Sequence, residues 1–117
     1  MVTIIADKQD ILIVLISIVQ TMKNEVMKMY HHNLKIQERF VKPILENEKR
    51  FEIRSNDRCF QKGDLVSFTV VDNNNIDKET LHHKYNEFER MDFEITYVIS
   101  GWGLKNGYVV FGFKARC

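Results

Sequence analysis

The first strong pattern of apolar positions lies near the start of the chain. Apolar residues recur there at steps of three and four, at Leu12, Leu15, Val19, Met22, Val26 and Met29. Such steps place the side chains along one side of a helix, and Asp7 stands where it can cap the first turn. We therefore predict a helix over residues 8–29.

The stretch ILIVLISIV, residues 11–19, is apolar on nearly every side of such a helix. A helix of this kind has to be covered by its own domain or by a partner chain. Three alternatives stay open. The helix packs against its own domain, or it carries self-association or another protein partner, or it is an appendage ahead of an alternative start at Met27 or Met29.

The same apolar run does not predict a membrane segment. Asp10 and Lys23 bracket it at twelve residues, and a helix of that length spans about 18 Å, well below the roughly 30 Å of a hydrocarbon core. The positively charged start and the small-residue cleavage site of a secretory signal are also missing. We therefore expect no membrane partner.

From residue 31 onward the pattern changes to the short alternation that is typical of strands. Five segments are expected to form strands: residues 34–37, 49–55, 65–71, 93–100 and 108–114, of which residues 65–71 contain few polar positions. Residues 38–46 predict one short helix between the first two strands, and residues 78–90 have room for another. Turn-forming residues dominate the remaining segments, of which residues 72–80 are expected to be a surface loop.

These elements predict the α+β class and, within it, a small, mostly antiparallel β-barrel with one embedded short helix. Residues 1–29 are then an N-terminal helical extension, and residues 30–117 form the domain. The length of 117 residues suits a single domain with a real hydrophobic core.

Charge narrows the classes of function. The net charge is only +1, whereas a protein that tracks a long stretch of nucleic acid is usually strongly basic. The charge is unevenly spread, with five bases against two acids in residues 49–62 and seven acids against three bases in residues 72–94. We expect one basic and one acidic surface on a nearly neutral body.

Cysteine and histidine usage gives no sign of a disulfide framework or a metal centre. Cys59 and Cys117 form no CxxC motif, so reduced thiols and a cytoplasmic location are expected. The pairs His31-His32 and His82-His83 lack the ligand spacing of zinc sites. We predict neither a metal nor a cofactor.

The most highly charged strand lies in the segment NEKRFEIRSNDR, residues 47–58. Alternation puts Phe51 and Ile53 on one face, where they are expected to anchor the strand in the core, and Glu52 and Arg54 on the other. Lys49 joins that pair only if the chain bends just after Asn47, a residue that tolerates the left-handed conformation. A surface ion-pair network and a ligand site both fit this pattern.

The spacing Asn47-x-Lys49-x-x-Glu52-x-Arg54 resembles the ASCH-domain signature GxKxxExR, with Asn47 in the place of the glycine. The wider frame of HNLKI, EKRFEIRSNDRCFQKGD and YVISGWGLKNGYVVFGFK is similar to a small, uncharacterised ASCH-like family of bacteria and phages. The resemblance covers residues 30–117. It implies a PUA-like β-barrel with a cleft for RNA or for nucleotide-like ligands.

The resemblance turns the charged strand into a candidate ligand site. Arg54 would clamp a phosphate or a base edge, Lys49 would add a second positive charge, and Glu52 would accept from a ligand N–H or orient Arg54. Weaker candidates stand nearby or in the late glycine-rich loop: Lys35, Asn56, Asp57, Arg58 and Trp102. Trp102 is expected either to stack on a base or to plug the end of the barrel.

Three hypotheses about function follow. The first is an RNA- or nucleotide-binding module without catalysis. The second is an amidohydrolase for modified nucleosides, since some bacterial ASCH-fold proteins use the signature lysine, a threonine three residues later and a distant acid. Here Lys49 matches, but Glu52 occupies the threonine position and no acid stands in GWGLKNG. The third is a protein-interaction factor, for instance of a phage, that uses the apolar helix.

Overall fold

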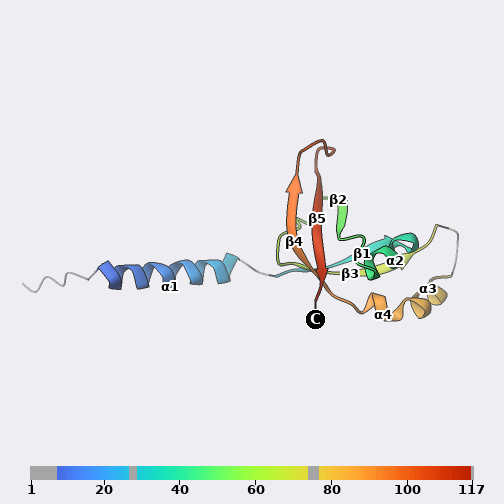
Figure 1. Ribbon diagram of the computed structural model, residues 1–117, viewed down its shortest axis with the longest axis horizontal. Coiled ribbons are helices and arrows are strands. Elements are labelled where there is room, and N and C mark those ends of the chain that lie inside the picture. Colours follow the sequence, from blue (N-terminus) through green and yellow to red (C-terminus); the bar gives the residue numbers. More distant parts are fainter. Residues whose placement is uncertain (1–7, 27–28, 74–76, 117) are drawn as a thin grey trace, which may run out of the picture.

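The structure, a computed structural model, describes residues 8–26, 29–73 and 77–116. Its first element is helix α1 (Lys8–Val26), which extends away from the rest of the molecule (Figure 1). The aliphatic side chains between Ile11 and Val19 are about half exposed, so the domain does not cover them. Of the three alternatives for this helix, packing against its own domain is therefore not the arrangement in the structure. Asp7 and Met27 lie outside the described residues.

The domain is built on one five-stranded sheet, and all five predicted strands are confirmed. They are β1 (His31–Gln37), β2 (Phe51–Ser55), β3 (Leu65–Val71), β4 (Phe93–Ser100) and β5 (Tyr108–Ala115). Their order across the sheet is β1-β3-β4-β5-β2. Only the β1–β3 pair is parallel, and the other three pairs are antiparallel.

Short helices fill the connections between the strands. A 3-10 turn η1 (Glu38–Phe40) and helix α2 (Val41–Leu45) link β1 to β2, where one helix was predicted. Two further helices, α3 (Lys78–Lys84) and α4 (Asn86–Glu89), link β3 to β4. The prediction of a single embedded helix is therefore too low, because the Asp77 side chain caps α3 within a segment whose polar residues indicated a loop.

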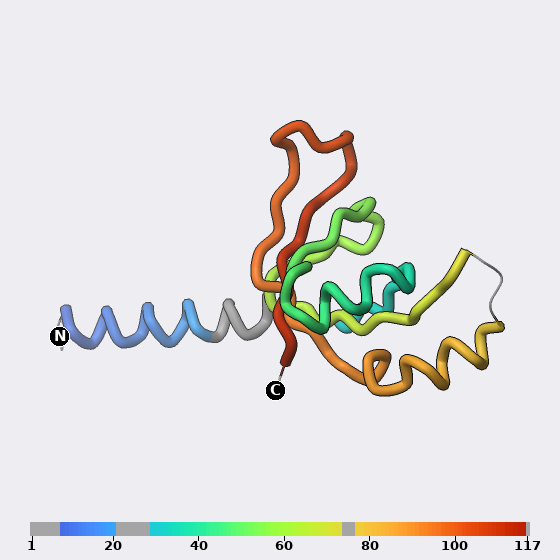
Figure 2. The backbone as a smooth tube through the Cα atoms, turned by 45° about the vertical axis from the view of Figure 1, so that its right-hand side comes forward, coloured from blue at the N-terminus to red at the C-terminus, as the bar shows by residue number. Residues whose placement is uncertain are grey.

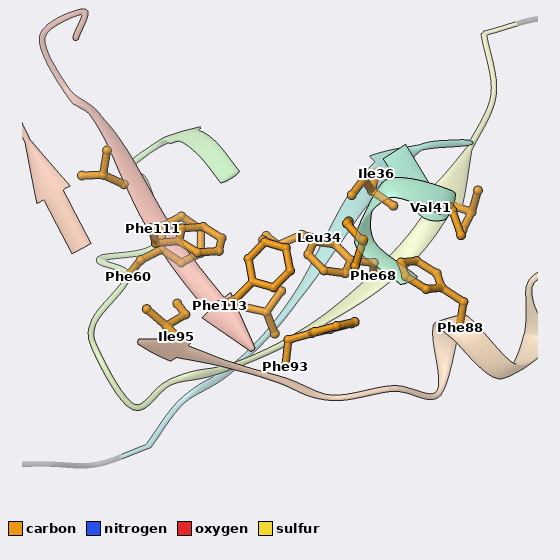
Figure 3. Close-up of a cluster of buried hydrophobic side chains, with 14 residues drawn as sticks. Leu34, Ile36, Val41, Phe60, Phe68, Phe88, Phe93, Ile95, Phe111 and Phe113 are labelled. Carbon is orange, nitrogen blue, oxygen red and sulfur yellow. The ribbon is translucent and has the colours of Figure 1, made fainter. Parts of the chain in front are cut away.

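The core lies between the sheet and the helices and is rich in phenylalanine (Figure 3). Phe68 on β3 is at its centre, with its ring centroid 5.5 Å from that of Phe93 and 5.7 Å from that of Phe113. Phe88 of α4 stacks on Phe68 from the helix side. Such rings bring large buried areas and hold the short helices against the sheet.

Strand β4 contains a β-bulge. The register between β4 and β5 shifts between Ile95 and Tyr97, and Gly112 of β5 lies opposite. A Cβ atom at Gly112 would stand 3.0 Å from the Thr96 hydroxyl, so any larger residue there would require the Thr96 side chain to shift. The glycine therefore leaves room for the Thr96 hydroxyl beside β5.

The two edge strands, β1 and β2, pair with each other nowhere along their described length. Two arginine side chains bridge them instead. Arg54 Nη2 donates to the Lys35 carbonyl at 2.6 Å, and Arg58 Nη1 donates to the Asn33 carbonyl at 2.8 Å. The α+β class is therefore confirmed, but the sheet is not closed into a barrel. We call this side-chain-bridged opening the seam; Figure 2 shows the same chain path from a second side.

Candidate functional site

The chain turns sharply at the end of α2. Asn47 adopts a φ of 60°, which an asparagine tolerates better than most residues. The amides of Glu48 and Lys49 both donate to the Pro43 carbonyl, at 2.9 and 3.1 Å, and so close the helix end. The bend predicted just after Asn47 is confirmed, and it sends the Lys49 side chain back along β2.

Lys49, Glu52 and Arg54 form one chain of charged side chains. Lys49 Nζ donates to one carboxylate oxygen of Glu52, and Arg54 Nε donates to the other at 2.8 Å. Glu52 is only 6% exposed. A buried carboxylate costs several kcal/mol unless it is paired and hydrogen bonded, and here each of its oxygens has a cationic partner. We refer to these three residues as the charged triad.

The alternation of the sequence correctly predicted that Glu52 and Arg54 share one face of β2. The prediction that this face points outward is wrong. Phe51 and Ile53, the expected core anchors, are 47% and 53% exposed. The register explains the inversion, because Glu52 pairs with the fully buried Phe111 of β5. Residues opposite each other in a sheet share a face, so Glu52 points inward.

Aromatic rings hold the amine of Lys49 in place. Its Nζ lies 4.9 Å from the centre of the Phe40 ring and 5.1 Å from that of Phe51, and it also donates to the Phe51 carbonyl. Contacts of a cation with ring faces add to the hydrogen bonds. The ammonium group is therefore fixed on four sides, by two rings, a carboxylate and a main-chain oxygen.

A cavity of about 480 Å³ opens beside the triad, between the end of α2 and the β4–β5 pair. Three cations line it, Lys49, Arg50 and Lys114, together with the amide of Asn47 and the hydroxyl of Thr96. Its apolar floor is made by Ile44, Phe93, Phe113 and Ala115. No acid stands among its described lining residues. We call it the cationic cavity.

Two contacts place the outer cations of this cavity. Arg50 Nε donates to the Asn47 carbonyl at 3.2 Å, and its guanidinium makes no other contact with the described residues. Lys114 lies 3.5 Å from Glu94 and is two-thirds exposed, so this pair is loosely held. Both side chains can therefore turn toward an anion in the cavity at small cost.

The seam carries a second row of polar groups. On β1, Asn33 donates to the Ser67 hydroxyl at 3.0 Å and accepts from the Thr69 hydroxyl at 2.9 Å. Its carbonyl receives Arg58. The guanidiniums of Arg54 and Arg58 thereby satisfy carbonyls of an edge strand that would otherwise face the opening alone.

The structure separates the remaining candidates from the triad. The Lys35 side chain lines another cavity, of about 440 Å³, between β3 and α3 with Lys78 and His82. Asn56 is structural, since its side chain accepts from the Phe60 amide and its own amide donates to Gly107. Asp57 is exposed in the turn that follows β2.

Trp102 stands at the tip of the β4–β5 hairpin and is 91% exposed. The prediction that it plugs the end of a barrel is wrong. Its φ of 53° and the positive φ of Gly101 and Gly103 form a tight tip that turns the indole outward. The cationic cavity lies at the opposite end of the hairpin, where β4 begins and β5 ends.

A buried pair that the sequence did not single out fixes the start of the sheet. His32 Nε2 and Asp64 Oδ2 lie 2.9 Å apart, and the carboxylate also accepts from the amides of Tyr30 and Gln61. This cluster ties β1 to the turn before β3. In the part of the chain that the structure describes, no three acidic, histidine or cysteine side chains gather as metal ligands.

A third polar contact joins η1 to the helices after β3. The Tyr85 hydroxyl donates to Glu38 Oε1 at 2.7 Å, and Lys84 Nζ donates to the same oxygen at 3.2 Å. The Tyr85 hydroxyl, with Lys84 second, holds the pKa of Glu38 below its usual value. Burial raises the pKa of Tyr85. The contact braces η1, which supplies Phe40 to the site.

A family model, described as a domain of unknown function (DUF3850), matches residues 31–113 of the chain. The chain belongs to the DUF3850 family. The match begins at the first residue of β1 and includes the triad, the seam and most of β5, and it leaves α1 outside. A search of curated proteins found no match.

Within the DUF3850 domain, sequence reasoning found the triad but missed half of the cationic cavity. Arg50 stands inside the charged segment, yet alternation alone gave it no role. Thr96 and Lys114 come from strands far along the chain, and only the sheet brings them beside α2. No pattern in the sequence marks that meeting. The described helices include none that is long and apolar enough to span a membrane.

Proposed function

We propose that this DUF3850 domain is a binding module for RNA or a nucleotide-like ligand, and that the cationic cavity holds its phosphate. The observation that carries the proposal is the lining, in which three cations and two neutral polar groups gather over an apolar floor with no acid among the described lining residues. Lys49 and Lys114 keep their ion pairs with Glu52 and Glu94, which lie outside this lining. Phosphate contacts in proteins use this mixture of arginine, lysine and neutral donors.

We further infer that the fold is a PUA-like barrel whose last pairing is made by side chains. The two edge strands face each other across the seam, and the arginines bridge them where a closed barrel would have main-chain pairing. The resemblance of Asn47, Lys49, Glu52 and Arg54 to the ASCH signature supports this relationship, because the structure gathers all four around one turn and one strand.

The triad has a positioning role in this proposal. Glu52 offsets one of the two charges beside it, and it fixes Lys49 at the inner wall of the cavity. Arg50 and Lys114, whose own contacts are few, are the groups that close on the ligand. A preordered cation with two adaptable ones costs less side-chain entropy on binding than three mobile cations.

A base has a surface to stack on next to the cavity. The Phe51 ring is half exposed and stands 5.1 Å from Lys49 Nζ. Stacking on an aromatic side chain contributes about 1–3 kcal/mol per base with little dependence on sequence. The outward Phe51, unexpected from the strand pattern, therefore fits a nucleotide better than an anchoring role would.

The contacts of Lys49 favour binding over hydrolysis. A nucleophile or general base needs an unprotonated amine in reach of the substrate. Lys49 instead donates to Glu52 and to the Phe51 carbonyl and lies against two rings. The amidohydrolase hypothesis has no such observation in its favour.

The charge balance limits the size of the site. With a net charge of +1 and three cations at the cavity, we expect contact with only a few phosphates and a shallow dependence on salt. Cys59 is exposed and free of any disulfide, which agrees with the cytoplasmic location that we include in the proposal. Cys117 lies outside the described residues.

Fluorescence anisotropy with a short single-stranded RNA and with nucleotides tests the proposal. The test variant is Arg50→Ala with Lys114→Ala, which removes the two adaptable cations. Its control is Lys62→Ala with Lys78→Ala, which removes the same charge from exposed positions outside the cavity. We expect the test variant to bind at least tenfold more weakly than both the control and the native chain. Equal affinity of the two variants, or no binding by the native chain, contradicts the proposal.

A further inference from the structure

Helix α1 runs away from the domain (Figure 2), and its apolar side chains between Ile11 and Val19 are about half exposed. Leu12, Leu15 and Val19 are 56%, 52% and 48% exposed, and the aliphatic residues around them are similar. In a monomer in water, nine consecutive positions of this kind would face solvent with a single serine among them. Contiguous exposed apolar surface of this extent indicates an interaction site.

The spacing in α1 is that of a coiled coil. Leu12, Leu15, Val19, Met22 and Val26 follow the alternating steps of three and four that a heptad repeat assigns to its two core positions. Met29, just after the helix, continues the same steps. Helices with this spacing pack against helices that carry it too, so the pattern itself selects the partner.

The opposite side of α1 carries one polar line, with the apolar Ile13 and Val14 beside it. Asp10, Ser17 and Asn24 are seven residues apart and occupy the heptad position farthest from the core positions. Ser17 keeps this line polar even inside the run ILIVLISIV. A helix meant to be buried on every side would not need such a line, whereas a helix in a bundle leaves this side in water.

Charge argues against a lipid surface as the occupant. Residues 8–26 carry two bases, Lys8 and Lys23, and two acids, Asp10 and Glu25. Helices that lie on membranes are usually rich in lysine and arginine on the polar face, which draws them to anionic lipids. A helix of zero net charge with an acid in its first turn has no such attraction.

We propose that α1 assembles identical chains into a helical bundle, with the line of Leu12, Leu15 and Val19 at the centre. Ile11, Ile16 and Ile18 flank that line and widen the apolar side beyond the narrow stripe of a two-stranded coil. The bundle is therefore expected to hold more than two helices. Each chain carries its DUF3850 domain outside the bundle, so the assembly presents several cationic cavities together.

Multi-angle light scattering of the purified full chain tests the assembly. The core variant, Leu15→Glu with Val19→Glu, disrupts the apolar line of the helix, and its control is Ser17→Glu with Asn24→Glu. Both add two glutamates, which are good helix formers, and only the first places them at core positions. The native chain and the control are expected at a multiple of the 13.9 kDa chain mass, and the core variant at 13.9 kDa.

Thermal unfolding of both variants is the control for folding. An unchanged unfolding temperature of the domain means that the two variants differ in assembly and not in folding. A native chain at 13.9 kDa, or equal dissociation of both variants, overturns the proposal. Sedimentation with vesicles of phosphatidylcholine and phosphatidylserine separates the lipid alternative. We expect the native chain to stay in the supernatant, and a monomer that pellets with vesicles would assign α1 to a lipid surface instead.

Discussion

Arg54 donates through Nη2 to the main-chain carbonyl of Lys35, 2.6 Å away, and this one contact joins the two edges of the sheet. The same guanidinium donates through Nε to Glu52. Arg54 therefore links the charged triad of β2 to the main chain of β1. The planar fork of arginine serves both acceptors at once, which a lysine cannot do.

Replacing this arginine should weaken the fold. Arg54→Ala leaves one oxygen of the buried Glu52 and the Lys35 carbonyl without their donor, and we expect a loss of about 2–4 kcal/mol in the free energy of unfolding. Arg54→Lys should recover only part of this loss. Arg58→Ala is the matched control, because it removes one exposed hydrogen bond and should cost at most about 1 kcal/mol. Urea unfolding measures all three, and equal losses for Arg54→Ala and Arg58→Ala would refute the additional role of Arg54 as a partner of the buried Glu52.

Neutralising Glu52 tests whether its carboxylate only positions Lys49 or also contacts the ligand. Glu52→Gln keeps the size of the side chain but leaves Lys49 and Arg54 without their shared anion. We expect the free energy of unfolding to fall by about 3 kcal/mol, while RNA binding by the folded fraction weakens less than in the variant with Arg50→Ala and Lys114→Ala, because Glu52 positions Lys49 but does not contact the ligand. Urea unfolding and anisotropy give the two values. Loss of binding in a folded Glu52→Gln variant would show that the carboxylate contacts the ligand.

The Tyr85–Glu38 contact gives a prediction about pH. A carboxyl group whose pKa is lowered in the folded state stabilises the fold above its ordinary pKa, and this contribution disappears as the pH falls through the lowered value. Tyr85→Phe removes the first cause of the lowering. The pKa of Glu38 should then rise toward 4.5, its ordinary value, and less stability should be lost on acidification, because the folded-state and unfolded-state pKa values lie closer together. NMR titration of the Glu38 carboxyl follows the first effect, and an unchanged titration would contradict it.

The exposed aromatic residues are expected to behave differently. Phe51→Ala should weaken RNA binding by about 1 kcal/mol or more, since it removes the proposed stacking surface. Ile53→Ala, on the same outward face, is the control and should leave binding unchanged. Trp102→Ala should also leave mononucleotide binding unchanged, because the indole stands at the far end of the hairpin. A larger effect of Trp102→Ala than of Phe51→Ala would move the site to the hairpin tip.

The alternation of the sequence was enough to predict where the strands lie, because a strand shows a period of two in any sheet register. It could not settle which face of β2 is inside. The pairing of Glu52 with Phe111 decides that, and a shift by one residue would reverse it. The charged face was taken as the outer one because Phe51 and Ile53 were expected to anchor the strand in the core. The cationic partners that allow Glu52 to be buried became visible only in the fold.

The candidate site was predictable to the extent that it is local. The bend at Asn47 and the shared face of Glu52 and Arg54 follow from residue type and spacing within eight residues of chain. The cationic cavity depends on Thr96 and Lys114, which the β4 bulge and the β4–β5 pairing bring to the end of α2. The seam depends likewise on β1 and β2 becoming the two edges of one sheet.

Mapping the ligand contact by ¹H–¹⁵N NMR tests the central claim most directly. A short single-stranded RNA is titrated into the full chain, and the amide shifts are followed residue by residue. The account predicts that the largest shifts fall on Asn47, Arg50, Thr96 and Lys114, with Phe51 beside them. Shifts centred on Trp102 or on the cavity of Lys35 and His82, or no shifts at all, would contradict it.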